Sequence, residues 1–178
     1  MAITIDRVAE AKKYPGHDNF GQVEPNHLSA QYSGEIYAQL PANSDIHTLE
    51  QGMFVKYDTA AGELNYTGKG AWMLVYNEEK LYDERKQMHR DFALVDTNFD
   101  DKKLYSRVYR MHEGDIYTTT MVKKEALNVG DLMVVGAAGV LEKTATEITS
   151  LKGLVLEVAK ETIMPDGHPA VKLRVVQE

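Results

Sequence analysis

The stretch from Leu127 to Leu141, which reads LNVGDLMVVGAAGVL, decides the fold class of this 178-residue chain. Its first part, Leu127-x-x-Gly130, is typical of a turn that leads into an apolar strand, here Asp131–Val135. Its second part, Ala-Ala-Gly-x-Leu at 137–141, is typical of a tight hairpin turn, because glycine adopts the positive φ that strains a residue with a Cβ. The stretch therefore predicts short β-strands separated by glycine turns.

The same pattern occurs earlier in the chain, in the same order and at a nearly constant offset. Four pairs of segments match: Gly34-Glu-Ile-Tyr37 with Gly114-Asp-Ile-Tyr117 (offset 80), Leu49-x-x-Gly52 with Leu127-x-x-Gly130 (78), Ala60-Ala-Gly-x-Leu64 with Ala137-Ala-Gly-x-Leu141 (77), and Leu74-Val75 with Leu154-Val155 (80). This self-similarity indicates an internal duplication. Each module has about 65–70 residues, close to the lower limit for an independent core, so we expect the modules to pack on each other or on a partner. The alternative is that unrelated β-segments reuse the same turn chemistry.

Further short segments are rich in aromatic and β-branched residues, as strands are. They are 34–40, 53–57 and 72–76 in the first half, and 116–121, 131–135, 151–158 and 170–176 in the second. Pro165-Asp-Gly-His-Pro169 predicts a tight hairpin turn between the last two. Short strands about ten residues apart predict an all-β sandwich or barrel. The expected fold is all-β, with two similar small barrel or sandwich modules preceded by an extended N-terminal arm.

The expected domain organisation has four parts. An arm covers 1–31, a first β module 32–95, a connector 96–113 and a second β module 114–178. Frequent proline and glycine between residues 9 and 28 interrupt any helical or strand period, so we expect an arm that is ordered by docking. The alternative is a frayed terminus. The charged segment 77–111 predicts either a helix over 78–90 or an extended connection with strands at 92–95 and 104–109.

Charge and composition exclude several classes of protein. Twenty Lys and Arg against 27 Asp and Glu give a net charge of −7, whereas a nucleic-acid binder needs a basic stripe. The chain has no cysteine, which excludes disulfides, thiolate catalysis and zinc–thiolate sites. We see no signal-peptide pattern, and no apolar run approaches the roughly 18–20 residues of a membrane span. We therefore expect a soluble protein with no nucleic-acid or membrane partner.

The second half carries a series of turn-and-strand motifs: Leu127-x-x-Gly-Asp-Leu132, Ala138-Gly-x-Leu141, Gly153-Leu-Val-Leu-Glu-Val158 and Pro165-Asp-Gly-x-Pro-Ala-Val171. This series resembles the small β-barrel modules of tailed-phage head proteins, among them capsid decoration (cement) proteins and related minor structural proteins. Arg107–Thr120 is similar in kind, so the resemblance covers about 105–178 and extends weakly, through the repeat, to 32–76. It implies a non-enzymatic virion protein that binds the major capsid protein through its surfaces, with no active site and no cofactor. The chain departs from the usual decoration pattern, which is a single module.

Few residues have the spacing of a catalytic centre. The six histidines are dispersed, with no H-E-x-x-H or H-x-H pair. His89 with Asp91, and Asp166 with His168, would share a face of a strand. However, no nucleophile accompanies either pair, so we expect no catalytic residue.

Two patterns partly match ligand-binding loops. Asp96-x-Asn98-x-Asp100 copies the first three ligand positions of a calcium loop, but Asp101 and Arg107 stand where glycine and glutamate are required. We therefore expect a solvated acidic turn and no metal site. The other pattern, glycine-rich 68–70, lacks the spacing of a phosphate-binding loop.

Tyrosine is the most frequent aromatic residue, with ten copies against four of Phe and one of Trp. Tyrosine is favoured at interfaces, where it combines apolar area with a polar tip. The alternative is that these rings pack within the chain. The candidate partner-contact residues are Tyr14, Phe20, Leu28, Tyr32, Tyr105 and Tyr109.

The expected function is decoration of a capsid, with the major capsid protein and other copies of the chain as partners. Packaged DNA would repel a chain of charge −7, so we expect it on the outer capsid surface of the virion, after synthesis in the host cytoplasm. One alternative is a head–tail connector or tail-associated protein. Another is an enzyme with a dispersed carboxylate and histidine site.

Overall fold

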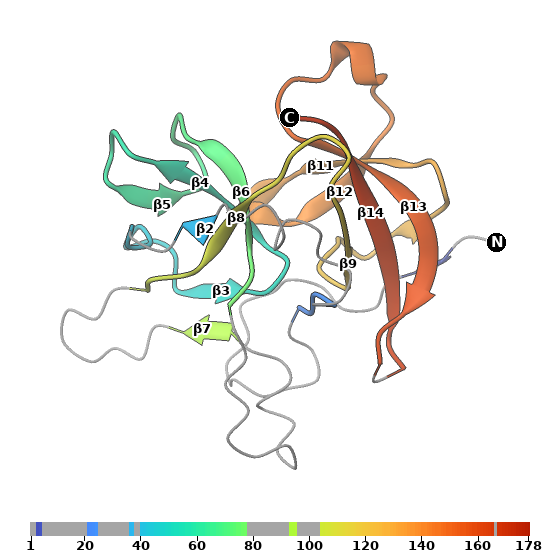
Figure 1. Ribbon diagram of the computed structural model, residues 1–178, viewed down its shortest axis with the longest axis horizontal. Coiled ribbons are helices and arrows are strands. Elements are labelled where there is room, and N and C mark those ends of the chain that lie inside the picture. The colour runs from blue at the N-terminus through green and yellow to red at the C-terminus, as the bar shows by residue number, and fades with distance from the viewer. Residues whose placement is uncertain are drawn as a thin grey trace.

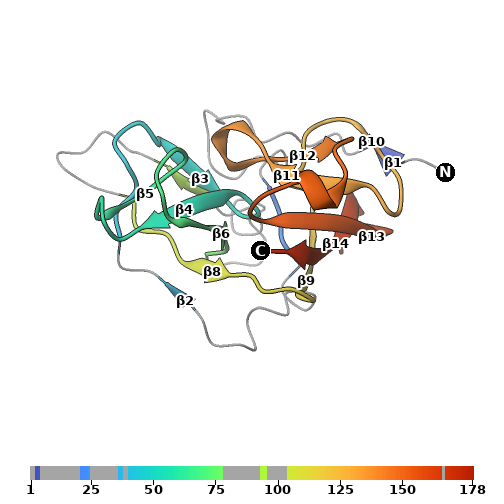
Figure 2. The ribbon, with the colours of Figure 1, turned by 90° about the horizontal axis from the view of Figure 1, so that it is seen from above.

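The computed structural model describes residues 3–4, 21–24, 36–37, 40–77, 93–95, 104–165 and 167–178. Within these ranges the chain is all-β, as predicted, and the only helical pieces are two short 3-10 turns, η3 (Ala137–Gly139) and η4 (Ile148–Ser150). No helix in this part of the chain is long and apolar enough to cross a membrane. Two five-stranded antiparallel sheets lie side by side (Figures 1 and 2).

Both sheets have the same strand order. The first sheet runs β2 (Ile36–Tyr37), β8 (Val108–Arg110), β6 (Ala71–Val75), β4 (Phe54–Asp58) and β5 (Glu63–Asn65). The second runs β9 (Ile116–Thr119), β14 (Pro169–Gln177), β13 (Val155–Ile163), β11 (Leu132–Val135) and β12 (Leu141–Thr144). When the strands of each sheet are numbered along the chain, both orders are 1-5-4-2-3, so each strand has a counterpart in the other sheet.

Three of the four matched segments lie at equivalent positions in the two sheets. They are the first strand of each sheet, the turn at Gly52 and Gly130, and the hairpin at Leu64 and Leu141. Ile36 and Ile116 each begin the edge strand that pairs with the last strand of its sheet. In the β4–β5 and β11–β12 hairpins, Leu64 and Leu141 occupy the same place in the pairing, opposite Tyr57 and Val135.

The fourth match is wrong. The N–H of Gly52 donates to the carbonyl oxygen of Val75 at 2.9 Å, and the N–H of Gly130 donates to that of Val158 at 2.8 Å. Val75 is therefore the counterpart of Val158, at an offset of 83, and not of Val155.

Among the described residues, one turn geometry occurs three times, at 50–53, 112–115 and 128–131. Its third residue is a glycine with φ between +87° and +91° (Gly52, Gly114 and Gly130). A left-handed backbone of this kind strains any residue that has a Cβ. In the last two turns an aspartate at the fourth position accepts the N–H of the first residue, as Asp131 does from Asn128 at 2.7 Å. This hydrogen bond gives a reason for the Gly-Asp pair at both turns of the second half, at 114–115 and 130–131.

The two sheets differ in the connection between their last two strands. β13 and β14 are joined by a tight turn over 164–168, closed by the Gly167 N–H, which donates to the Met164 carbonyl at 2.8 Å. The corresponding connection from β6 to β8 spans 76–107 and contains β7 (Ala93–Val95), which pairs with β3 (Thr48–Glu50). β8 itself falls inside the predicted connector 96–113, so the first sheet extends past the expected boundary at 95. The helix considered for 78–90 lies outside the described residues.

Two pieces of the predicted arm pair with the second half of the chain. β1 (Ile3–Thr4) pairs with β10 (Ala126–Leu127), and Val23 forms a bridge with Thr119 at the end of β9. Residues 21–24 are all buried, and the Glu24 N–H donates to the Thr118 carbonyl at 2.9 Å. These pieces therefore dock on the chain itself, and the remainder of 1–31 lies outside the described residues.

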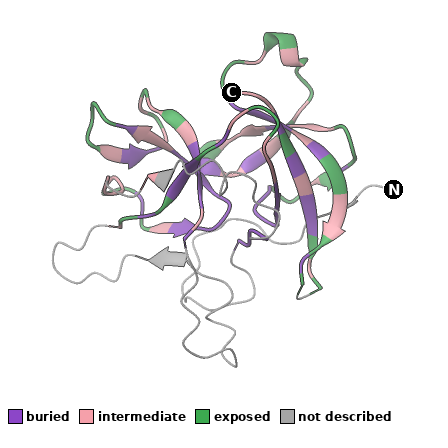
Figure 3. Ribbon diagram, viewed as in Figure 1, coloured by how far each residue is buried: buried purple, intermediate pink, exposed green. Residues whose placement is uncertain are grey.

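The core is shared between the sheets. Phe54, Leu74 and Tyr109 form a cross-strand row on one face of the first sheet and pack in the same cluster as Tyr117 and Leu156 of the second sheet. Because successive strand residues point to opposite faces, their neighbours form the other face of the sheet. That face joins a second buried cluster, whose members include Val55, Met73, Val108, Leu49 and Met121. The first sheet thus has buried residues on both of its faces, and the two modules pack on each other. Figure 3 shows buried residues in the strands of both sheets.

Candidate functional site

A cleft of about 600 Å³ opens where the two sheets meet, and we call it the seam cleft. Its wall on the first-sheet side comes from β4, β6 and the end of β8, and its other wall from the loop before β13 and the residue after β14. This volume lies within the range of about 300–1,000 Å³ that is typical of binding sites. The lining residues are Lys56, Gly70, Ala71, Trp72, Arg110, Met111, Lys152, Gly153, Leu154 and Glu178.

Lys56 and Trp72 form the centre of the first wall. They are directly opposed on β4 and β6, on the face of the sheet that carries Phe54 and Leu74. The Lys56 ammonium lies over the Trp72 ring, 5.1 Å from its centroid, and donates to the Gly68 carbonyl at 2.7 Å. The cation is therefore fixed by a cation–π contact and a hydrogen bond, each of which limits its rotation.

The loop beside Lys56 is held by Asp58. Its carboxylate accepts the backbone N–H groups of Ala60 and Ala61, each at 3.1 Å, and of Lys69 at 2.9 Å. These hydrogen bonds, first the one from Ala61 and then the one from Lys69, hold the pKa of Asp58 below its ordinary value. The glycine-rich 68–70 segment, considered above as a phosphate loop, thus directs the Lys69 N–H to a carboxylate of its own chain.

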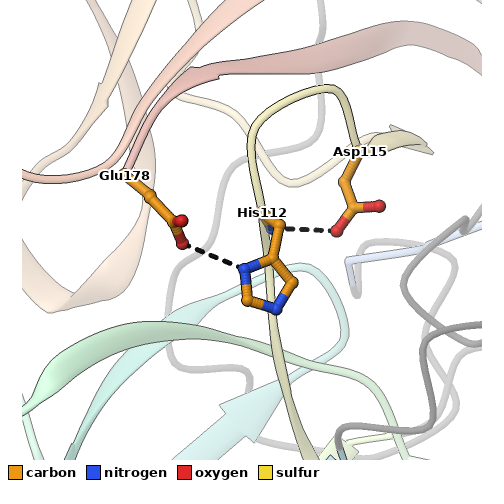
Figure 4. Close-up of polar contacts among 3 residues, drawn as sticks. All are labelled: His112, Asp115 and Glu178. Carbon is orange, nitrogen blue, oxygen red and sulfur yellow. Dashed lines mark hydrogen bonds and ion pairs between the residues drawn. The ribbon is translucent and has the colours of Figure 1, made fainter.

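Hydrogen bonds of the last two residues, Gln177 and Glu178, hold the opposite wall in place. Figure 4 shows the Glu178 carboxylate beside the His112 ring, with 3.1 Å between Oε2 and Nδ1. The His112 backbone N–H donates to Asp115 Oδ2 at 2.9 Å within the repeated turn. On the loop side, Gln177 Nε2 donates to the carbonyls of Leu151 and Gly153 at 3.0 and 3.2 Å. These contacts tie β14 to the Lys152 loop and give the cleft a defined shape.

The chemistry of the seam cleft suits binding. The residues that line it include three with cationic side chains (Lys56, Arg110 and Lys152), one carboxylate (Glu178), and the apolar Met111 and Leu154. In the described ranges, no three His, Asp or Glu side chains are grouped as metal ligands. The arrangement therefore offers cations and an aromatic face to a ligand with negative charge.

The predicted partner-contact residues that the structure describes differ in exposure. Tyr105 is 55% exposed and available for contact, although the seam cleft does not include it. Tyr109 is only 4% exposed and packs against the Tyr76 ring, with centroids 5.9 Å apart. It is a core residue of β8 and so is not a surface contact of this chain. Tyr14, Phe20, Leu28 and Tyr32 lie outside the described residues.

The residues considered for catalysis or metal binding lie mostly outside the described part of the chain. His89, Asp91, Asp166 and the acidic turn 96–100 all fall there. His168 belongs to the β13–β14 turn, where its carbonyl oxygen accepts the Met164 N–H at 2.8 Å.

Sequence reasoning missed Trp72, Arg110 and Lys152 as members of one site. The one available signal was that Trp72 is the chain's single tryptophan, next to a glycine-rich turn. Arg110 and Lys152 are far apart in sequence and meet only because the sheets pack. No family model, curated protein or solved structure matches the chain.

Proposed function

We propose that this chain is a non-enzymatic structural protein of a tailed-phage virion that binds the major capsid protein on the outer surface of the shell. The observation that carries the proposal is the 1-5-4-2-3 strand order, found in both sheets with the same glycine turns. It supports an internal duplication of one small β module. The motifs of that module are the ones that resemble phage decoration proteins.

The way the N-terminal segments bind supports a role in assembly. Residues 21–24 add backbone hydrogen bonds at the end of β9, and β1 adds a short strand beside β10. Addition of an extended segment to a strand edge gives affinity through main-chain hydrogen bonds and is a common mode of protein recognition. The arm therefore has the chemistry to join sheets, within one copy or between neighbouring copies.

The proposed mechanism is cementing. A shell presents many identical binding positions, so a weak interface at each one adds up to firm attachment when several copies contact one another. The charge of −7 disfavours a place beside packaged DNA and favours the outer surface.

The test is to compare particles that contain the chain with particles made without it. We expect the chain on purified particles, and we expect particles without it to break at lower temperature. Unchanged heat and salt stability would contradict cementing. A copy number confined to one vertex, measured by gel densitometry, would favour a connector or tail protein instead.

A further inference from the structure

Positive charge is concentrated in the seam cleft, against the sign of the whole chain. Lys56, Arg110 and Lys152 line one cavity in a protein whose net charge is −7. Arg110 and Lys152 are exposed, and neither forms an ion pair with any residue that the structure describes. A surface of this kind attracts negative charge over a distance of about 8–10 Å at ordinary salt.

The cleft's own carboxylate already has a partner. Glu178, the single acidic residue among those that line the cleft, is paired with the His112 ring at 3.1 Å. The Lys56 ammonium is held by Trp72 and the Gly68 carbonyl. The cations that remain to meet a ligand are therefore Arg110 and Lys152, one on each wall.

The cleft has the composition of a protein–protein contact. Two of its apolar residues, Met111 and Leu154, are only 2% and 7% exposed, while Arg110 and Lys152 are exposed. A buried apolar centre, a charged rim, and tryptophan and arginine as anchors are the features of binding hot spots. Its walls are fixed by the Gln177 and Lys56 hydrogen bonds, so a partner need not order them on binding.

From this geometry we infer that the seam cleft binds an acidic segment of a partner protein, which places a carboxylate between Arg110 and Lys152 and an apolar side chain against Trp72. Identifying the partner with the capsid shell rests on the proposed function, whereas the site itself is tested on the isolated chain. Arginine binds carboxylates in two parallel hydrogen bonds, which would fix the orientation of the segment.

The test uses Trp72, the chain's single tryptophan, as a reporter inside the cleft. A blocked synthetic hexapeptide that alternates glutamate and leucine is titrated into the full-length protein at low salt, and the tryptophan fluorescence is followed. We expect a saturable change that weakens as salt is added. An analogue with glutamine in place of every glutamate should bind at least tenfold more weakly.

Matched variants locate the binding. The double variant Arg110→Ala/Lys152→Ala should bind the acidic peptide at least tenfold more weakly, while Lys160→Ala, which removes an exposed lysine from β13, should bind like the wild type. Circular dichroism and thermal melting confirm that each variant is folded. No saturable change with wild-type protein would overturn the inference, as would equal binding by the double variant. Inorganic phosphate that binds as tightly as the peptide would also overturn it, since the cleft would then be a small-anion site.

The same variants separate this inference from the proposed function. We expect Arg110→Ala/Lys152→Ala protein to bind chain-free particles at least tenfold more weakly than Lys160→Ala protein. If the acidic peptide binds the cleft but no variant or wild-type chain binds particles, the proposed function fails and the cleft assignment stands. If the double variant binds particles normally, the shell is not the partner of this cleft.

Discussion

Replacing Gly139 by alanine tests whether the two modules form one packed body. Gly139 (φ +74°) and its counterpart Gly62 (φ +73°) occupy the same hairpin turn of the repeat. A Cβ at Gly139 would overlap the carbonyl oxygen of Phe54 in the other sheet and press on the Tyr66 ring, whereas a Cβ at Gly62 would meet nothing within 4 Å. Both substitutions therefore carry the same cost of a left-handed backbone. Only Gly139→Ala also disturbs the contact between the sheets.

The magnitudes follow from those two effects. Alanine in the left-handed region costs about 1–2 kcal/mol at either position. Forcing an extra carbon into a packed contact costs about 1–3 kcal/mol more. We therefore expect Gly62→Ala to lower the free energy of unfolding by about 1–2 kcal/mol, and Gly139→Ala by about 2–5 kcal/mol.

Urea unfolding measures both losses, with Trp72 fluorescence reporting on the seam and circular dichroism on the sheets. Because the core is shared, both signals should change in one transition with the same midpoint. Losses that agree within about 0.5 kcal/mol would refute the packing of η3 on β4, and so would two separate transitions.

Three further predictions concern buried polar groups. Tyr117 is fully buried and its hydroxyl has no hydrogen-bond partner in the described structure, so Tyr117→Phe should raise the free energy of unfolding by about 1 kcal/mol; a loss measured by urea unfolding would contradict this. Thr119 Oγ1 donates to the Gln22 carbonyl at 2.7 Å, so Thr119→Val should cost about 1–3 kcal/mol and speed hydrogen exchange of the Thr120 amide, which donates to the same carbonyl; unchanged exchange would show that residues 21–24 do not dock there. Asp58 has a folded pKa below the ordinary 3.8, so its contribution to stability is present above pH 3.8 and is lost as the pH falls through the folded pKa. The stability difference between wild type and Asp58→Ala, measured by urea unfolding, should therefore shrink between pH 5 and pH 2, and a constant difference would exclude this role.

Repeated turns made the fold class predictable from the sequence. A turn position with φ near +90° can be recognised in the sequence, because it favours glycine and strains other residues. In the Gly-Asp pairs at 114–115 and 130–131, the aspartate also accepts a hydrogen bond within the turn. These local constraints placed the turns and the strands next to them.

The later strands of each module were harder to align, because length changes there are not marked by any turn. The offset between counterparts rises from 77 at Leu64 and Leu141 to 83 at Met73 and Leu156, across a longer loop that contains η4. Leu74-Val75 and Leu154-Val155 match by identity, yet two apolar residues fit many strand positions. In the charged segment 77–111 the alternative with strands at 92–95 and 104–109 agrees with β7 and in part with β8, although β8 shares no motif with its counterpart β14.

The site was the least predictable part. Tyr109 was a candidate contact residue because it lies in the connecting segment, outside the clearest predicted strands, but it packs in the buried cluster that the two sheets share. Arg110, the next residue, ends β8 and lines the seam cleft, which residues from both halves of the chain form. A pattern along one strand indicates which residues share a face, but not which face another sheet will cover.

An image reconstruction of native particles would show whether the chain decorates the shell. We expect density for two adjacent five-stranded sheets on the outer surface of the shell, repeated over its capsid subunits, with the seam cleft against an acidic segment of the capsid protein. Particles with no such density, or with the chain only inside the head, would contradict this expectation.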